Sequence, residues 1–160
     1  MFIDPQKPLE TCEFKDCATC TVRNAVHCHF QAPDLKKFLL MFLPAFIFGV
    51  AGVARTGWLH LLPMTGIFIG YFGFLEIRVM CSHCPHYADE GNHLRCWANY
   101  GSPKIWRYRP GPMSGWEKFW FLAGMAAVFA YPAVWMVVSS QWLVFGGYVL
   151  SVAGFFYGLR

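Results

Sequence analysis

Long runs without charged residues dominate the hydrophobic pattern of this chain. No Asp, Glu, Lys or Arg occurs from Phe38 to Ala54, from Thr56 to Leu75, or from Phe119 to Leu159. About 20 apolar residues cross the hydrocarbon of a bilayer, and a helix on a soluble domain would need a polar face that these runs lack. The pattern therefore predicts an all-α integral membrane protein with four transmembrane helices.

The polar stretches between these runs predict the organisation of the chain. They divide it into a Cys-rich tail at 1–34, a transmembrane hairpin of spans 1 and 2 at 35–79, a Cys/His-rich loop at 80–115, and a hairpin of spans 3 and 4 at 116–160. The very short turn from Arg55 to Gly57 predicts a tight pairing of spans 1 and 2, in which Gly66 and Gly70 allow close backbone approach. The tail lacks the apolar stretch of a secretory signal peptide.

Composition and charge extend this prediction to the orientation of the chain. Charged residues make up 14% of the sequence, against roughly 25% in soluble domains. Four spans with short 1–2 and 3–4 turns would pack the tail and the central loop together on one face. That face holds twelve of the thirteen Lys and Arg residues, all except Arg55, so we expect it to lie in the cytoplasm, with lipids around the spans. A net charge of +4 gives no reason to expect nucleic acid as a partner.

Candidate chemistry is confined to the tail and the loop. The tail carries Cys12, Cys17, Cys20 and Cys28 with His27 and His29, and the loop carries Cys81, Cys84 and Cys96 with His83, His86 and His93. Thiolates and imidazoles in such clusters are the ligands of zinc and of iron–sulfur centres. Cytosolic thiols stay reduced, and seven cysteines are an odd number, so we expect metal binding rather than disulfides.

The spacing leaves the identity of the metal open. The first three tail cysteines follow the C-x4-C-x2-C spacing of plant-type [2Fe–2S] ferredoxins, but the fourth comes sooner than in that family. The three loop cysteines need a fourth ligand, either a histidine or a residue of the tail. Mixed Cys and His ligands favour zinc, whereas the Cys84-Pro85 pair resembles the Cys-Pro that closes bacterial ferredoxin motifs and favours iron–sulfur. No C-x-x-C-H motif occurs, so we expect no covalent haem, and His60 is the only histidine in any span, so we expect no bis-His haem either.

These features predict a membrane-bound iron–sulfur protein that transfers electrons between a cytoplasmic protein and a lipid-soluble, quinone-type carrier, as one subunit of a larger complex. If the chain is an enzyme, its reaction is redox. Glu76, near the cytoplasmic end of span 2, is a candidate for proton transfer to the carrier, because ionisable groups at membrane depth are commonly functional. The structural alternative is that Glu76 forms an interfacial ion pair with Arg78 or Lys118.

Two other functions remain open at this stage. In the first, zinc joins the tail to the loop and makes a non-enzymatic docking scaffold. In the second, the chain is a quinone-linked thiol–disulfide oxidoreductase. The vitamin K epoxide reductase family is similar in combining a four-span bundle with C-x2-C pairs, but its reactive cysteines face the oxidising side of the membrane. No phosphate-binding loop, dinucleotide fingerprint or nucleophile elbow supports hydrolytic or nucleotide-driven chemistry.

Overall fold

The computed structural model describes residues 32–88, 91–96, 98–109 and 111–158, and in these residues the fold is all-helical. An isolated bridge between His93 and Pro103 is the one β feature of the described residues. The elements are α1 (Ala32–Thr56), η2 (Trp58–His60), α2 (Leu61–Gly70), η3 (Tyr71–Leu75), α3 (Glu76–Val79), η4 (Cys81–His83), α4 (Pro85–Ala88), α5 (Gly115–Val138) and α6 (Trp142–Gly158). The predicted all-α class is therefore confirmed.

Three helical stretches are long and apolar enough to cross a membrane. They are Ala32–Thr56, Trp58–His83 and Gly115–Val138. The last helix, α6, is also apolar but has 17 residues. Helix α5 begins where a capping box predicts a start: Ser114 Oγ accepts from the Glu117 amide at 3.2 Å, and Glu117 Oε2 accepts from the Ser114 amide at 2.9 Å.

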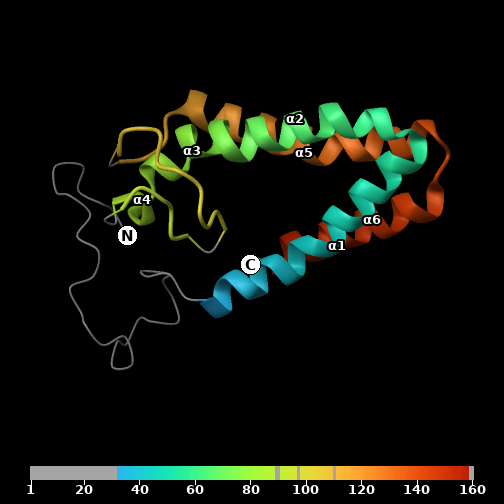
Figure 1. The fold of residues 1–160 in the computed structure, drawn as a ribbon, viewed down its shortest axis with the longest axis horizontal. Helices are drawn as coiled ribbons and strands as arrows, with labels where there is room; N and C mark the ends of the chain where they lie inside the picture. Colours follow the sequence, from blue (N-terminus) through green and yellow to red (C-terminus); the bar gives the residue numbers. More distant parts are fainter. Residues whose placement is uncertain (1–31, 89–90, 97, 110, 159–160) are drawn as a thin grey trace.

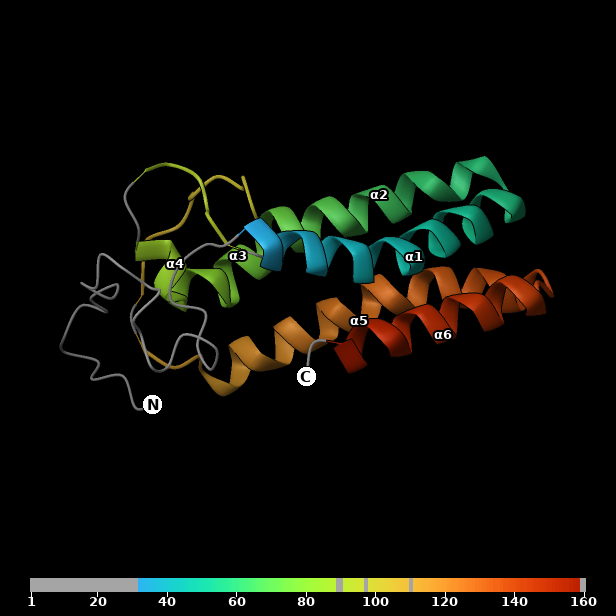
Figure 2. The ribbon, with the colours of Figure 1, turned by 90° about the horizontal axis from the view of Figure 1, so that it is seen from below.

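The helices pair across the two hairpins rather than within them. Figure 1 shows the α2–α3 stretch beside α5, and α1 beside α6, with the two pairs diverging toward the loop. Helix α1 makes its most extensive contact with α6, a smaller one with α5 and very little with α2. Figure 2 shows the same helices running alongside one another from the loop to the opposite turns.

The predicted tight pairing of spans 1 and 2 is therefore wrong. A side chain added at Gly66 or Gly70 would meet nothing within 4 Å. Within the first hairpin, the glycines that do allow close approach to another helix are in α1: an added carbon at Gly49 would lie 3.6 Å from Pro132, and one at Gly52 would overlap the Met136 side chain of α5. The Gly66-x-x-x-Gly70 pattern indicates a helix that can pack closely against another helix, but it does not indicate which helix that is.

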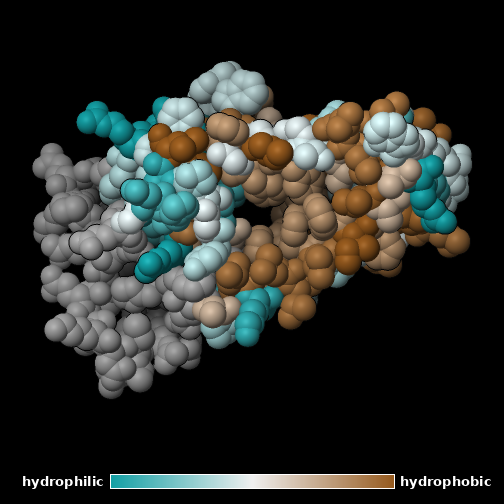
Figure 3. Space-filling view, viewed as in Figure 1, coloured by the Kyte–Doolittle hydropathy of each residue, from teal (hydrophilic) through white to brown (hydrophobic). Residues whose placement is uncertain are grey.

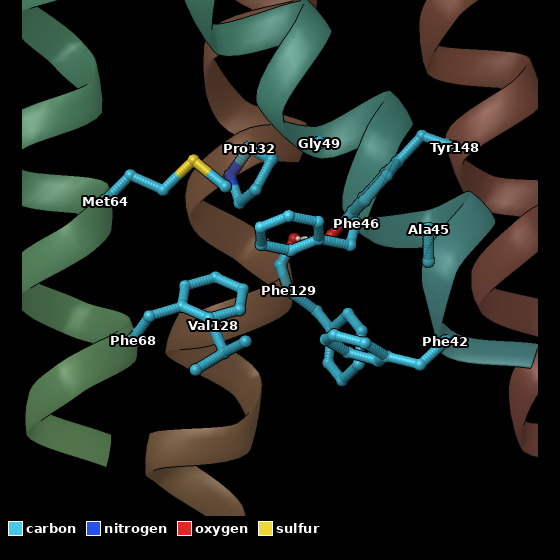
Figure 4. A pocket seen from close by; sticks show the side chains of 10 residues that line it. All are labelled: Phe42, Ala45, Phe46, Gly49, Met64, Phe68, Val128, Phe129, Pro132 and Tyr148. Atoms are coloured by element: carbon cyan, nitrogen blue, oxygen red, sulfur yellow. Dashed lines mark hydrogen bonds between the residues drawn. The ribbon is translucent and has the colours of Figure 1, made fainter. Parts of the chain in front are cut away.

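Aromatic side chains fill the middle of the bundle. Rings from α1, α2, α5 and α6 converge there (Figure 4), and the space left between them is about 10 Å³. That space is at the lower limit for a single water molecule. The Tyr148 hydroxyl donates to the Phe129 carbonyl at 2.9 Å, which satisfies the one polar group among these rings. The centre of the bundle is thus a packed core without room for an organic molecule.

The outer surface of the helices is strongly apolar. Leu40, Leu143 and Leu150 are 70%, 94% and 75% exposed. Figure 3 shows hydrophobic residues covering the long helices on the face in view and hydrophilic residues gathered at the loop end. A soluble protein rarely exposes so continuous an apolar surface, because water contact with it is unfavourable.

Polar contacts close the bundle at the end away from the loop. The Gln141 side-chain amide donates to the Gly52 carbonyl and to Thr56 Oγ1, both at 3.1 Å. Thr56 Oγ1 also lies 2.9 Å from Ser139 Oγ. These contacts connect the end of α1 to the turn between α5 and α6, and so hold the two hairpins together where they do not diverge.

Candidate cysteine centre

The helix that leads to the loop cysteines changes its winding just before it reaches them. The stretch Tyr71–Leu75 is a π-helical turn between α2 and α3. Such turns leave a backbone carbonyl without its usual helical partner and are frequent at functional sites. Here the Phe72 carbonyl accepts a hydrogen bond from the Asn99 side-chain amide at 3.5 Å. A residue of the loop therefore inserts against the helix at this turn.

Asn99 joins a buried carboxyl to a buried thiol. Its amide nitrogen lies 3.2 Å from Glu76 Oε2 and 3.8 Å from Cys81 Sγ, and its amide oxygen accepts from the Ser102 hydroxyl. Glu76 is 5% exposed and Cys81 is 4% exposed. The alternative of an interfacial ion pair between Glu76 and Arg78 is not what the structure has, since Arg78 lies beside Glu117 instead. Glu76 is thus a buried group that contacts the cysteine centre through Asn99.

Two of the three loop cysteines, Cys81 and Cys84, lie in one turn at the end of the apolar helix. The Cys84 amide donates to the Cys81 carbonyl at 2.9 Å, so the C-x2-C pair folds into a single turn. Cys84 and Cys96 both lie within electrostatic range of Cys81. Cys81, Cys84 and Cys96 are all thiols, and none of them is half of a disulfide. In the described part of the chain, however, no three His, Cys, Asp or Glu side chains are arranged to hold one metal ion.

The loop histidines do not point toward a common centre. His83 Nδ1 lies 3.1 Å from the Gly111 carbonyl, and its Nε2 lies 3.4 Å from Glu117 Oε1. His86 is buried, whereas His93 is exposed and lies opposite Pro103 in the isolated bridge. Ligation by His83 would require its ring to leave two oxygen neighbours. The predicted tail ligands Cys12, Cys17, Cys20, Cys28, His27 and His29 lie outside the described residues.

An ion-pair cluster that the sequence reading missed fastens the loop to α5. Glu117 Oε1 lies 2.7 Å from Arg109 Nη1 and 3.6 Å from Arg78 Nη1. Arg109 also donates to the Arg78 carbonyl at 2.6 Å and to Ser82 Oγ at 3.1 Å. The spacing Ser114-x-x-Glu117 is a recognisable capping signal, so the position of Glu117 at a helix start could have been predicted from the sequence. The sequence holds no comparable signal for its partners Arg109 and Arg78, which lie 8 and 39 residues away along the chain.

A second segment of the loop lies against the C-x2-C turn. The Arg109 amide donates to the Ser82 carbonyl at 2.8 Å. The Tyr87 hydroxyl donates to the Trp106 carbonyl at 2.6 Å and accepts from the Trp106 amide at 2.9 Å. Between these two anchors, Tyr108 packs against the buried cluster that contains Cys81.

Taken together, these contacts form a loop that is fixed to α3 and α5 and that places the thiols of Cys81 and Cys84 in one turn at the end of an apolar helix. Asn99 and Tyr108 belong to this site, and nothing in their sequence context distinguishes them from ordinary loop residues. One fold can carry many different activities, so the reaction of a protein depends on the residues of its site. No protein-family model, no curated protein and no solved structure matches the chain.

Proposed function

We propose that the chain is an integral membrane protein that binds a metal centre through its loop cysteines and transfers electrons through it, with an iron–sulfur cluster as the centre. The observation that carries the proposal is the pair of thiols Cys81 and Cys84 in one turn at the end of an apolar helix, with Cys96 as a third thiol in the same loop. Thiolates are the usual ligands of such clusters. Three thiols leave one ligand to be supplied, and residues 1–31, which directly precede α1, contain four more cysteines.

The membrane assignment is part of the proposal. Three helices have the length and apolarity to span a bilayer, and we propose α6 as a fourth span, since its 17 residues are at the short end of the range of about 17–25 residues. The excess of Lys and Arg at the loop end then orients the cysteines toward the cytoplasm. A membrane-impermeant maleimide tests this orientation in intact cells, where the cysteines should be protected. Rapid labelling from outside would contradict it.

A groove along α1 supports a lipid-soluble electron carrier as the partner. It has a volume of about 600 Å³ and is lined by Leu39, Leu40, Phe42, Leu43 and Phe46, with Lys36 among its lining residues. Figure 3 shows the molecule hollowed between α1 and the α2–α3 stretch. The Phe42 ring lies 6.4 Å from the Phe72 ring, and the Phe72 carbonyl accepts from Asn99, which contacts Cys81. A quinone-type ring in this groove would lie along α1, one of whose lining rings, Phe42, contacts Phe72 of the π-helical turn that leads to the cysteines.

Anaerobic purification followed by metal analysis and visible absorption tests the metal proposal. We expect iron and sulfide in the protein with broad charge-transfer absorption, and we expect Cys81→Ser to lose both. Thr65→Ser is the matched control, because Thr65 is exposed on α2 and should leave the metal content unchanged. Colourless protein with stoichiometric zinc would contradict electron transfer and support the docking scaffold instead.

Thiol–disulfide exchange is the second candidate, and one observation favours it. The described residues place no three ligands around one point, whereas Cys81 and Cys84 share a single turn. In this reaction the two thiols form a disulfide and lose two protons and two electrons, and a quinone takes them up to become a quinol. Metal-free protein that forms the Cys81–Cys84 disulfide when a quinone is added would support this candidate. Protein with bound iron and no such disulfide would exclude it.

A further inference from the structure

A surface of cations and aromatic rings lies where the loop meets α3 and the start of α5. We define this cation–aromatic surface by its members: Arg78, Trp106, Trp116, Lys118 and Trp120. We propose that it binds the headgroup of an anionic phospholipid of the surrounding membrane, with Arg78 as the main contact to the phosphate. The inference goes beyond the proposed function and rests on its membrane assignment, not on its metal centre.

The ends of two apolar runs set the level of this surface in the bundle. No charged residue occurs from Thr56 to Leu75 or from Phe119 to Leu159. Arg78 and Lys118 are therefore among the first charges that lie beyond these runs toward the loop. Arg78 Nη1 lies 3.6 Å from Glu117 Oε1, so the two helix ends reach the same level. In a membrane that level is the headgroup region, where cations and tryptophan rings collect.

The positive charge of Arg78 is only partly offset by Glu117. Glu117 Oε1 lies 2.7 Å from Arg109 Nη1, the distance of a charge-assisted hydrogen bond, and 3.6 Å from Arg78 Nη1. Two guanidinium groups thus share one carboxylate, and positive charge is left over. The Arg78 side chain is 42% exposed, so an anion from outside the protein can approach it.

The Trp106 ring holds the Arg78 guanidinium in place without neutralising it. Arg78 Cζ lies 5.6 Å from the centre of this ring, which is the range of a cation–π contact. The backbone of Trp106 is itself fixed by two hydrogen bonds with the Tyr87 hydroxyl. A ring face competes weakly with an anionic oxygen, so the guanidinium keeps N–H donors for bidentate binding of a phosphate.

Aromatic rings of α5 continue the surface toward the apolar part of the bundle. The ring centres of Trp116 and Trp120 lie 5.5 Å apart, and both side chains are exposed. Lys118 is exposed in the same turns of the helix. A phospholipid with a net negative headgroup can meet the cations with its phosphate and the rings with its glycerol and acyl chains. A soluble anion would leave the rings uncovered, so lipid suits the surface better.

The test uses the full chain in a non-ionic detergent. Thermal unfolding is followed while dioctanoyl phosphatidylglycerol or dioctanoyl phosphatidylcholine is added, and the rise in unfolding temperature gives an apparent affinity. We expect phosphatidylglycerol to bind more tightly, and Arg78→Gln and Lys118→Gln each to weaken its binding about fivefold. Arg55→Gln is the matched control, because it removes an exposed cation from the last turn of α1, at the opposite end of the bundle, and should leave the affinity unchanged.

Lys118→Gln covers the case in which Arg78→Gln does not fold, since Lys118 is exposed. Equal affinity for the two lipids, or full affinity in Lys118→Gln, would overturn the inference. Equal stabilisation by inorganic phosphate or by a soluble acidic peptide would overturn the assignment to lipid. Chain that an alkaline carbonate wash strips from cell membranes would overturn the membrane assignment, and this inference with it. Membrane-embedded chain without a preference for phosphatidylglycerol would overturn the inference alone.

Discussion

Gly124 in α5 lies against Tyr71, the residue that begins the π-helical turn below the cysteine centre. An added carbon at Gly124 would lie 2.5 Å from Tyr71 Cε2 and 3.0 Å from Leu75 Cδ2, both shorter than ordinary carbon contacts. The Tyr71 ring cannot easily move aside, because it is 3% exposed and its hydroxyl donates to the Phe121 carbonyl at 3.2 Å. Gly124→Ala should therefore displace the ring, the π-helical turn or α5.

The expected cost follows from two opposing effects. Overpacking a buried site costs about 1–3 kcal/mol, while alanine gains roughly 0.5–1 kcal/mol over glycine within a helix. We expect a net loss of about 1–2 kcal/mol in the free energy of unfolding, measured by reversible denaturation in detergent. Gly66→Ala is the matched control, because an added carbon there meets nothing within 4 Å, and it should be neutral or stabilising. If both variants unfold alike, the contact between α5 and the π-helical turn does not exist as described.

Three further substitutions test the contacts that hold the site and the bundle. Asn99→Ala removes the amide that donates to Glu76 and should lower the free energy of unfolding by about 1–3 kcal/mol, measured by denaturation in detergent. Glu117→Gln weakens the contact with Arg109 and should cost about 1 kcal/mol at low salt and less at high salt, so denaturation is compared at the two salt concentrations. Gln141→Ala removes two hydrogen bonds to the end of α1 and should cost about 0.6 kcal/mol for each, whereas unchanged thermal unfolding would show that these bonds contribute nothing.

The helices themselves could be predicted from the sequence because their signal is local. Charge-free runs mark the apolar stretches, and the structure has α1, the α2–α3 stretch, α5 and α6 where these runs occur. The turn near Gly57 was likewise visible as a short polar interruption. These features depend on neighbouring residues only, so no knowledge of the tertiary contacts was needed to find them.

The packing partners could not be predicted, because apolar helices carry little information about direction. Gly66 and Gly70 suggested a contact that the structure does not make, whereas Gly52 packs on Met136, 84 residues away. The structural alternative for Glu76 was an ion pair with Arg78 or Lys118, yet its observed partner is Asn99. In each case several neighbours satisfy the same local chemistry, and the choice between them is made by the whole arrangement.

The divergence of the two helix pairs determines what holds the cysteine end together. Where the helix pairs separate, the loop is held by a small apolar cluster of Ile77, Tyr87 and Leu94. Polar contacts add to it: Asn99 bonds to α3, and Glu117 of α5 bonds to the loop. Neither contact uses a cysteine sulfur as its main partner. These contacts position the loop and its C-x2-C turn without using a cysteine sulfur as an anchor.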